Sequence, residues 1–164
     1  MSTVSDAIGR RGEAILFVLM TEFHSRKGPI FRPHFLGEKW PVADYLVELE
    51  RAGSQIPYFF VQVKTTREGY TKRHHRLKVR VCAKRVAALA AYPAPTYIVG
   101  VDEVKEVGYI VSANGERRGH MSSLSTCFPI NRPNRRSLWN EVRAFWRQRR
   151  SPALASAFRD SAWR

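Results

Sequence analysis

The chain has 164 residues, of which 44% are hydrophobic, and this composition supports one hydrophobic core and argues against a second domain. Its 28 Lys and Arg residues against 14 Asp and Glu residues give a formal net charge of +14, which favours a nucleic acid or an anionic membrane surface as partner. The apolar run at residues 14–20 is too short to span a bilayer, so we expect no membrane partner.

Two further features bear on where the protein works. No small-residue cleavage site follows the apolar run, so we expect no signal peptide. Cys82 and Cys127 match no metal-ligand spacing, and a chain of this size needs no disulfide to fold. We therefore expect reduced cysteines and a cytoplasmic location.

The first half of the chain predicts a helix followed by a hairpin. Apolar residues recur at helical spacing over residues 6–24, and Gly12 lies on the same face, where a neighbouring element can approach closely. Residues 26–40 are rich in Gly, Pro and aromatics and are predicted to form a connection. Residues 41–50 and 58–66 are predicted to be two strands, because the turn-forming residues 52–57 separate them.

The second half predicts a basic loop, two helices and three strands. The loop follows Lys64 and runs into a strand in which Leu77, Val79 and Val81 alternate with charged residues. An Ala-rich helix over residues 82–92, strands over 96–102 and 106–113, and a closing helix over 137–150 follow. The pattern predicts a single α/β domain over residues 1–150 and a loosely packed C-terminal tail over 151–164.

Polar residues interrupt the hydrophobic strand "YFFVQVKTT" near its end. Because side chains alternate along a strand, Gln62 and Lys64 point to the same face. A hairpin pairing brings Asp44 of the preceding strand to that face if the register permits. A carboxylate, an amide oxygen and an ammonium group would then meet at one edge of the sheet.

This combination suits phosphodiester hydrolysis with a divalent metal ion held by oxygen ligands. Asp44 would anchor the ion, and the Gln62 amide oxygen and the Val63 backbone carbonyl would be further ligands. Lys64 would orient the attacking water or offset charge on the phosphate. Glu13 would add a second carboxylate if the first helix packs against the hairpin.

The segments "GRRGEA", "VADYLVEL" and "VQVKTT", in this order, resemble the Glu, Asp and (Glu/Gln)-x-Lys elements of the PD-(D/E)XK nuclease superfamily. Within it, the chain is most similar to the DUF4365 family and, more remotely, to archaeal Holliday junction resolvases. The resemblance places Glu13, Asp44, Gln62 and Lys64 at active-site positions and implies a restriction-endonuclease-like central mixed β-sheet flanked by α-helices. Gln62 stands where most members have Glu, so metal affinity should fall unless Glu13 compensates.

Two groups of basic residues are candidates for contact with nucleic-acid phosphates. The loop group is Arg67, Lys72, Arg73, His74, His75 and Arg76, and the group on the closing helix is Arg143, Arg147 and Arg150. The alternative for each is an ordinary solvated loop or helix face. Glu13 and Asp44 also have structural alternatives, as an exposed helix residue and as a turn-capping residue.

The function expected from these features is an Mg²⁺- or Mn²⁺-dependent endonuclease acting on DNA, with RNA as the open alternative. Cutting both strands of a duplex often needs two sites, so a symmetric homodimer is expected. The rival hypothesis is a catalytically impaired nucleic-acid-binding module of the same fold, acting within a larger DNA-processing or defence complex.

Overall fold

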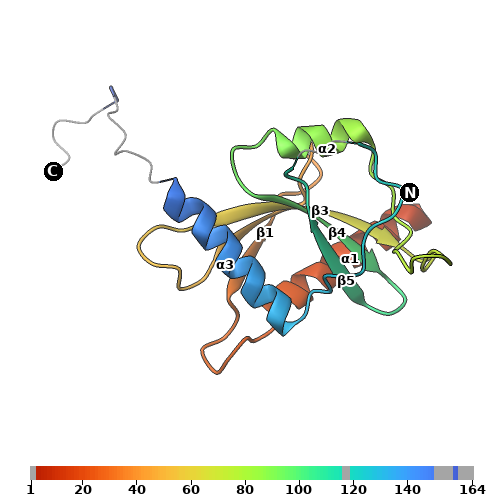
Figure 1. Ribbon diagram of the computed structural model, residues 1–164, viewed down its shortest axis with the longest axis horizontal. Helices are drawn as coiled ribbons and strands as arrows, with labels where there is room; N and C mark the ends of the chain where they lie inside the picture. Colours follow the sequence, from red (N-terminus) through yellow and green to blue (C-terminus); the bar gives the residue numbers. More distant parts are fainter. Residues whose placement is uncertain (1–2, 116–118, 150–156, 159–164) are drawn as a thin grey trace.

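The computed structural model describes residues 3–115, 119–149 and 157–158 of the chain. In this part of the chain, five strands form one sheet in the order β1-β2-β3-β4-β5, and three helices flank it (Figure 1). The strands are β1 (Phe31–Phe35), β2 (Tyr45–Leu49), β3 (Tyr58–Thr66), β4 (Thr96–Asp102) and β5 (Val107–Ser112), and the helices are α1 (Val4–Thr21), α2 (Ala83–Ala90) and α3 (Arg132–Gln148). Strands β3 and β4 are parallel, and the other neighbouring pairs are antiparallel. The expected α/β class, a mixed sheet flanked by helices, is confirmed.

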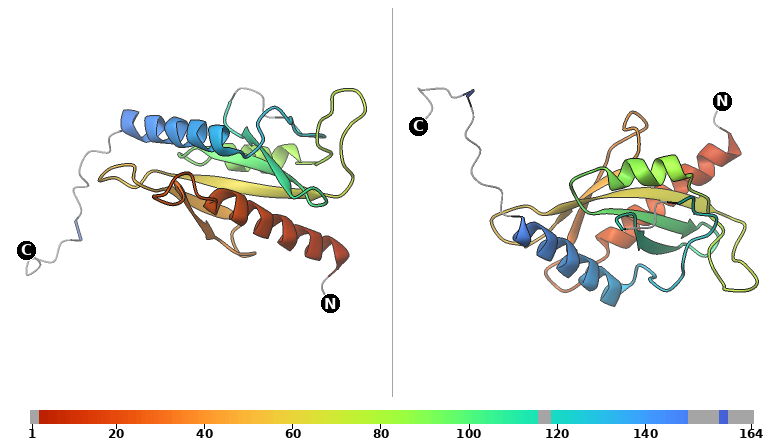
Figure 2. Two further views of the ribbon diagram at one scale, coloured as in Figure 1. Left: turned by 90° about the horizontal axis from the view of Figure 1, so that it is seen from below. Right: turned by 45° about the horizontal axis from the view of Figure 1, so that its top comes forward.

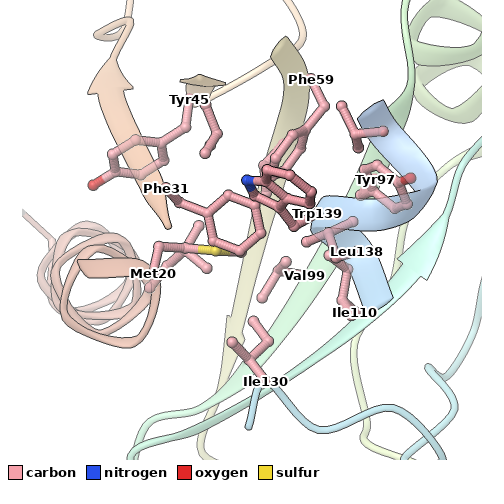
Figure 3. Packing of buried hydrophobic residues seen from close by; sticks show 14 of the residues in the cluster. Met20, Phe31, Tyr45, Phe59, Tyr97, Val99, Ile110, Ile130, Leu138 and Trp139 are labelled. Atoms are coloured by element: carbon pink, nitrogen blue, oxygen red, sulfur yellow. The ribbon is translucent and has the colours of Figure 1, made fainter. Parts of the chain in front are cut away.

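Two hydrophobic clusters hold the helices on the sheet. The first takes residues from both α1 and α3, and Figure 3 shows Met20 and Trp139 packing from two sides onto Phe31 and Phe59. The second lies under α2 and includes Leu89. Helices α1 and α2 therefore lie on opposite sides of the sheet (Figure 2).

Helix α1 begins at a capping box, in which Thr3 and Asp6 exchange hydrogen bonds between side chain and backbone at 2.9 and 3.2 Å. This cap starts the helix two residues before the sequence-based expectation. The helix ends at Thr21, so Phe23 lies beyond it and its side chain is 70% exposed.

Strand β1 corrects the expectation that residues 26–40 form only a connection. Phe31 pairs with Leu49 and Phe35 with Tyr45, and Pro33 lies in the middle of the strand. Proline has no N–H to donate, but β1 lies at the edge of the sheet, where one side of the strand needs no partner.

Two further expectations were wrong in detail. Residues 77–81 form isolated bridges, from Leu77 to Leu124 and from Val81 to Met121, instead of a strand. Helix α3 begins at Arg132, five residues early, because the Asn131 side chain caps it by accepting from the Asn134 N–H at 3.0 Å.

Candidate active site

Asp44 lies directly before β2 and is fixed to both neighbouring strands. Its N–H donates to the Val61 carbonyl at 2.8 Å, and its carbonyl accepts from the Leu36 N–H at 2.9 Å. Its carboxylate oxygen Oδ2 accepts from the Val63 N–H at 2.6 Å. The side chain therefore replaces a backbone acceptor at the point where β2 separates from β3.

The register brings Asp44 onto the face of Gln62 and Lys64. Tyr45 pairs with Val61, so the preceding residue, Asp44, lies across from Gln62. Lys64 follows two residues later on the same face of β3. The structure thus brings together the three polar side chains that the hairpin pattern placed at one edge.

Gln62 is buried, with 2% of its surface exposed. Its Nε2 donates to the Val42 carbonyl at 3.0 Å, but its Oε1 has no hydrogen-bond partner among the described residues. A buried acceptor without a partner is costly in a folded protein and calls for a ligand or water. The amide oxygen is therefore available to a bound cation.

Helix α1 brings Glu13 to the same edge. Gly12 lies against Thr65 of β3, and a Cβ at Gly12 would lie 2.7 Å from the Thr65 Cβ and closer still to its hydroxyl oxygen. The Tyr45 hydroxyl donates to the Glu13 carbonyl at 2.9 Å. Both contacts fix α1 on the β2–β3 pair, and a groove of about 600 Å³ beside Glu13 is lined also by Arg10, Phe35 and Glu38.

The ionisable groups of the site perturb one another. Burial raises the pKa of Asp44, opposed by the Val63 hydrogen bond and by the charges of Lys64 and Arg85. Burial also raises the pKa of Glu13, and the negative charges of Asp44 and Glu38 raise it further. Burial and then Arg85 lower the pKa of Lys64, and Asp44 opposes this change. These mutual effects place the four groups in one electrostatic cluster.

Arg85 is a site residue that the sequence reasoning missed. It belongs to the first half of α2, and its charge acts on both Asp44 and Lys64. Lys84 and Arg85 are cations near the N-terminus of a helix, where the helix dipole disfavours positive charge. Two cations at this unfavourable end of a predicted helix were the signal that could have identified Arg85 from the sequence.

The basic loop is a structured turn, and part of its charge is engaged in internal contacts. Arg67 pairs with Glu103 at 2.9 Å, and Arg76 donates to the Ser123 hydroxyl and carbonyl at 2.9 and 3.0 Å. The His75 ring stacks on Tyr70 with ring centres 4.4 Å apart. Lys72, Arg73, His74 and His75 are exposed, and Arg67 is exposed as well despite its ion pair.

The arginines of α3 lie away from this edge. The Trp146 Nε1 donates to the carbonyl of Tyr58, the first residue of β3, whereas Lys64 lies six residues further along the strand. At about 3.3 Å per residue, this separation is roughly 20 Å. Arg143 and Arg147 therefore do not join the candidate site, and Arg150 lies outside the described residues.

Comparisons of the chain with protein-family models, with curated proteins and with solved structures found no match. Within residues 3–115, 119–149 and 157–158, no three His, Cys, Asp or Glu side chains form a metal-binding group. In the same part of the chain, no helix is both long and apolar enough to cross a membrane. The geometry around Asp44 is therefore the feature of the molecule that indicates a function.

Proposed function

We propose that the protein is a metal-dependent nuclease of the PD-(D/E)XK type that hydrolyses phosphodiester bonds in DNA. The observation that carries the proposal is the position of Asp44, fixed across from Gln62 with Lys64 on the same face. Glu13 on α1 adds a second carboxylate, and its charge interacts with that of Asp44. Two acids, an amide oxygen and an amine in this arrangement suit metal-assisted attack of water on a phosphate.

The oxygen atoms of the site fit Mg²⁺ or Mn²⁺. Asp44 uses Oδ2 for the Val63 N–H, so Oδ1 is available, and the buried Gln62 Oε1 has no partner among the described residues. The Val63 carbonyl faces the same side of β3 as its N–H and is the third candidate ligand. A bound cation would supply Lewis-acid chemistry and relieve the repulsion between Glu13 and Asp44.

Lys64 and Arg85 are suited to the charge and proton changes of hydrolysis. The lowered pKa of Lys64 increases the fraction of neutral amine that can accept a proton from water. Its protonated form, together with Arg85, would stabilise the extra negative charge on the phosphate. Asp44 holds both cations at the edge, because its charge attracts them.

The first test is cleavage of supercoiled plasmid and of a labelled branched DNA in Mg²⁺, Mn²⁺ or EDTA. We expect metal-dependent cutting that falls at least about 100-fold in Asp44→Asn and Lys64→Ala. Asp44→Asn keeps a side-chain oxygen that can accept from the Val63 N–H, so it removes charge with little change in shape. Lys78→Ala, at an exposed lysine outside the site, is the matched control.

Wild-type cutting rates in either site variant, or equal cutting in EDTA, would contradict the proposal.

We further propose a symmetric homodimer, a cytoplasmic location and DNA in preference to RNA, since a dimer supplies one site for each strand. A parallel assay with labelled RNA and light scattering with duplex present would check the substrate and the stoichiometry.

The rival function is binding without chemistry. The observation that favours it is the neutral Gln62, which leaves the described site with fewer than three metal-binding carboxylates or histidines. We expect Gln62→Glu to bind Mg²⁺ more tightly than the wild type in calorimetry, because it adds a charge across from Asp44. An inactive wild type whose Gln62→Glu variant gains metal binding would identify an impaired site.

A further inference from the structure

A second group of basic side chains lies at the opposite end of the sheet from the candidate active site. Because α3 begins at Arg132, its arginines at 132, 136, 143 and 147 fall at nearly whole turns along one side of the helix. At 1.5 Å per residue, this row is about 22 Å long. We call these arginines, together with Arg51 and His24, the α3 basic surface.

Arg51 and His24 join the row through the turn that follows α1. Arg51 donates to the carbonyls of Lys27 and Pro29 at 3.2 and 2.7 Å, so its guanidinium group lies against this turn. Arg135 donates to the Leu19 carbonyl and pairs with Glu22, which fixes the start of α3 beside the same segment. Three separate segments of the chain therefore meet at His24.

The positive charges of this surface converge on the imidazole. Burial and the charges of Arg136, Arg132, Arg135 and Arg51 lower the pKa of His24. The ring atom Nδ1 is buried and has no hydrogen-bond partner in the described part of the chain. The surface is therefore short of negative charge, which a phosphate group supplies.

Nearby acids do not balance the surface. Glu22 pairs with Arg135, and Glu50 pairs with Arg32 at 2.7 Å. None of the α3 basic surface arginines forms a salt bridge with a described residue. The Trp139 ring contacts the guanidinium groups of Arg136 and Arg143 at 5.3 and 5.1 Å, which restrains both at the surface.

We propose that the α3 basic surface binds the phosphate backbone of a nucleic acid, at a place distinct from the candidate active site. In Figure 1 the N-terminal half of α3, which begins at Arg132, lies away from α2, which carries Arg85. A row of about 22 Å spans several phosphates of one strand, so it matches a polymer better than a single small anion. The proposal concerns binding alone and stands whether or not the protein cleaves DNA.

The test measures binding of a fluorescent 20-base-pair duplex by anisotropy in EDTA across a series of salt concentrations. The surface variant combines Arg51→Gln, Arg132→Gln and Arg136→Gln. The charge-matched control combines Lys78→Gln, Arg80→Gln and Lys105→Gln, all at exposed positions elsewhere. Thermal melting verifies that both variants are folded.

We expect the surface variant to lose at least about tenfold in affinity and to reduce the salt slope by about 0.9 for each lost phosphate contact. The control should lose much less. Equal losses in the two variants, or no loss in either, would overturn the proposal. Because binding is measured in EDTA, where no metal-dependent cleavage occurs, failure of cleavage and failure of this surface give different results.

A local readout identifies the kind of ligand. Nuclear magnetic resonance of the His24 ring is recorded during titration with the duplex and, separately, with inorganic phosphate. We expect the duplex to shift the signal at much lower concentration than inorganic phosphate. Equal responses at equal phosphate concentration would overturn the nucleic-acid assignment in favour of a small anion, and no response to either would overturn the site.

Discussion

Asp44 and Glu13 are both half-buried carboxylates, and the charge of Asp44 acts on Glu13, so together they lower the stability of the fold. The pKa of Asp44 is raised from 3.8 and that of Glu13 from 4.5, mainly by burial. Over the pH range between these ordinary values and the raised ones, the folded protein binds more protons than the unfolded chain. Both groups therefore lower the stability of the fold as pH rises through that range.

This cost predicts that removing one charge stabilises the metal-free protein at neutral pH. We expect Asp44→Asn and Glu13→Gln to raise the melting temperature at pH 7 in EDTA, by about 2–4 °C for each kcal/mol of repulsion and desolvation relieved. The gain over the wild type should vanish near pH 3, where both carboxyl groups are protonated. Circular dichroism melts at several pH values measure this difference.

Comparison of variants with the wild type is essential to this measurement. Asp6 has a lowered pKa, because the Thr3 backbone and side chain hydrogen-bond to it, and it contributes with the opposite sign. A variant that removes only Asp44 or Glu13 leaves that contribution unchanged. A melting temperature at pH 7 that falls in both variants would show that the carboxylates stabilise the fold instead.

The common face of Asp44, Gln62 and Lys64 follows from the period of two along a strand and from the hairpin order, so it was predictable from the sequence. The sequence did not predict that Gln62 Oε1 lacks a hydrogen-bond partner among the described residues, because this depends on the path of the chain at Val42. The position of Arg85 was not predictable from the sequence either, because its approach to Lys64 depends on how α2 crosses the sheet.

At the scale of elements, the close packing of α1 on β3 determines whether Glu13 reaches the candidate site. This packing depends on a residue without a side chain at position 12, because the Thr65 side chain fills the space that a Cβ would occupy. Gly9, one turn earlier in the same helix, has no atom within 4 Å of the position of an added Cβ. The two glycines therefore form a matched pair.

We expect Gly12→Ala to destabilise the protein by about 1–3 kcal/mol through overpacking. It should also lower cleavage, because α1 must move away from β3 and takes Glu13 with it. Gly9→Ala should instead stabilise the protein by about 0.5–1 kcal/mol, since alanine is the better helix former. Chemical denaturation of both variants measures the change in the free energy of unfolding. An equal change in the two variants would contradict the close packing of α1 on β3.

The errors in predicting β1 and residues 77–81 from the sequence have physical reasons. Pro33 and the glycines that flank β1 are typical of a connection, and only the edge position of β1 makes a proline acceptable there. Residues 77–81 alternate in burial like a strand, but they lie along Leu124 and Met121 through single bridges without a continuous ladder. Burial pattern and strand pairing are thus separate properties.

At the scale of the whole molecule, the net charge of +14 predicts a polyanionic partner but does not show where that partner lies. Placement depends on tertiary contacts between distant segments. Arg67 and Arg76 lie in the same basic run, yet both are held by internal partners. Arg51 and His24 lie far from α3 in the sequence, yet they border its first turn.

The parallel pairing of β3 with β4 has a consequence for the order of folding. Strands β1, β2 and β3 follow one another as antiparallel neighbours, so their contacts close short loops. The β3–β4 pair closes a loop of about 30 residues that contains α2, and this closure costs more chain entropy. We therefore expect Asp44 and Gln62 to meet in the part of the sheet that assembles from local contacts. Arg85 lies on α2 within this crossover, so we expect it to approach Asp44 and Lys64 only when the β3–β4 pair has formed.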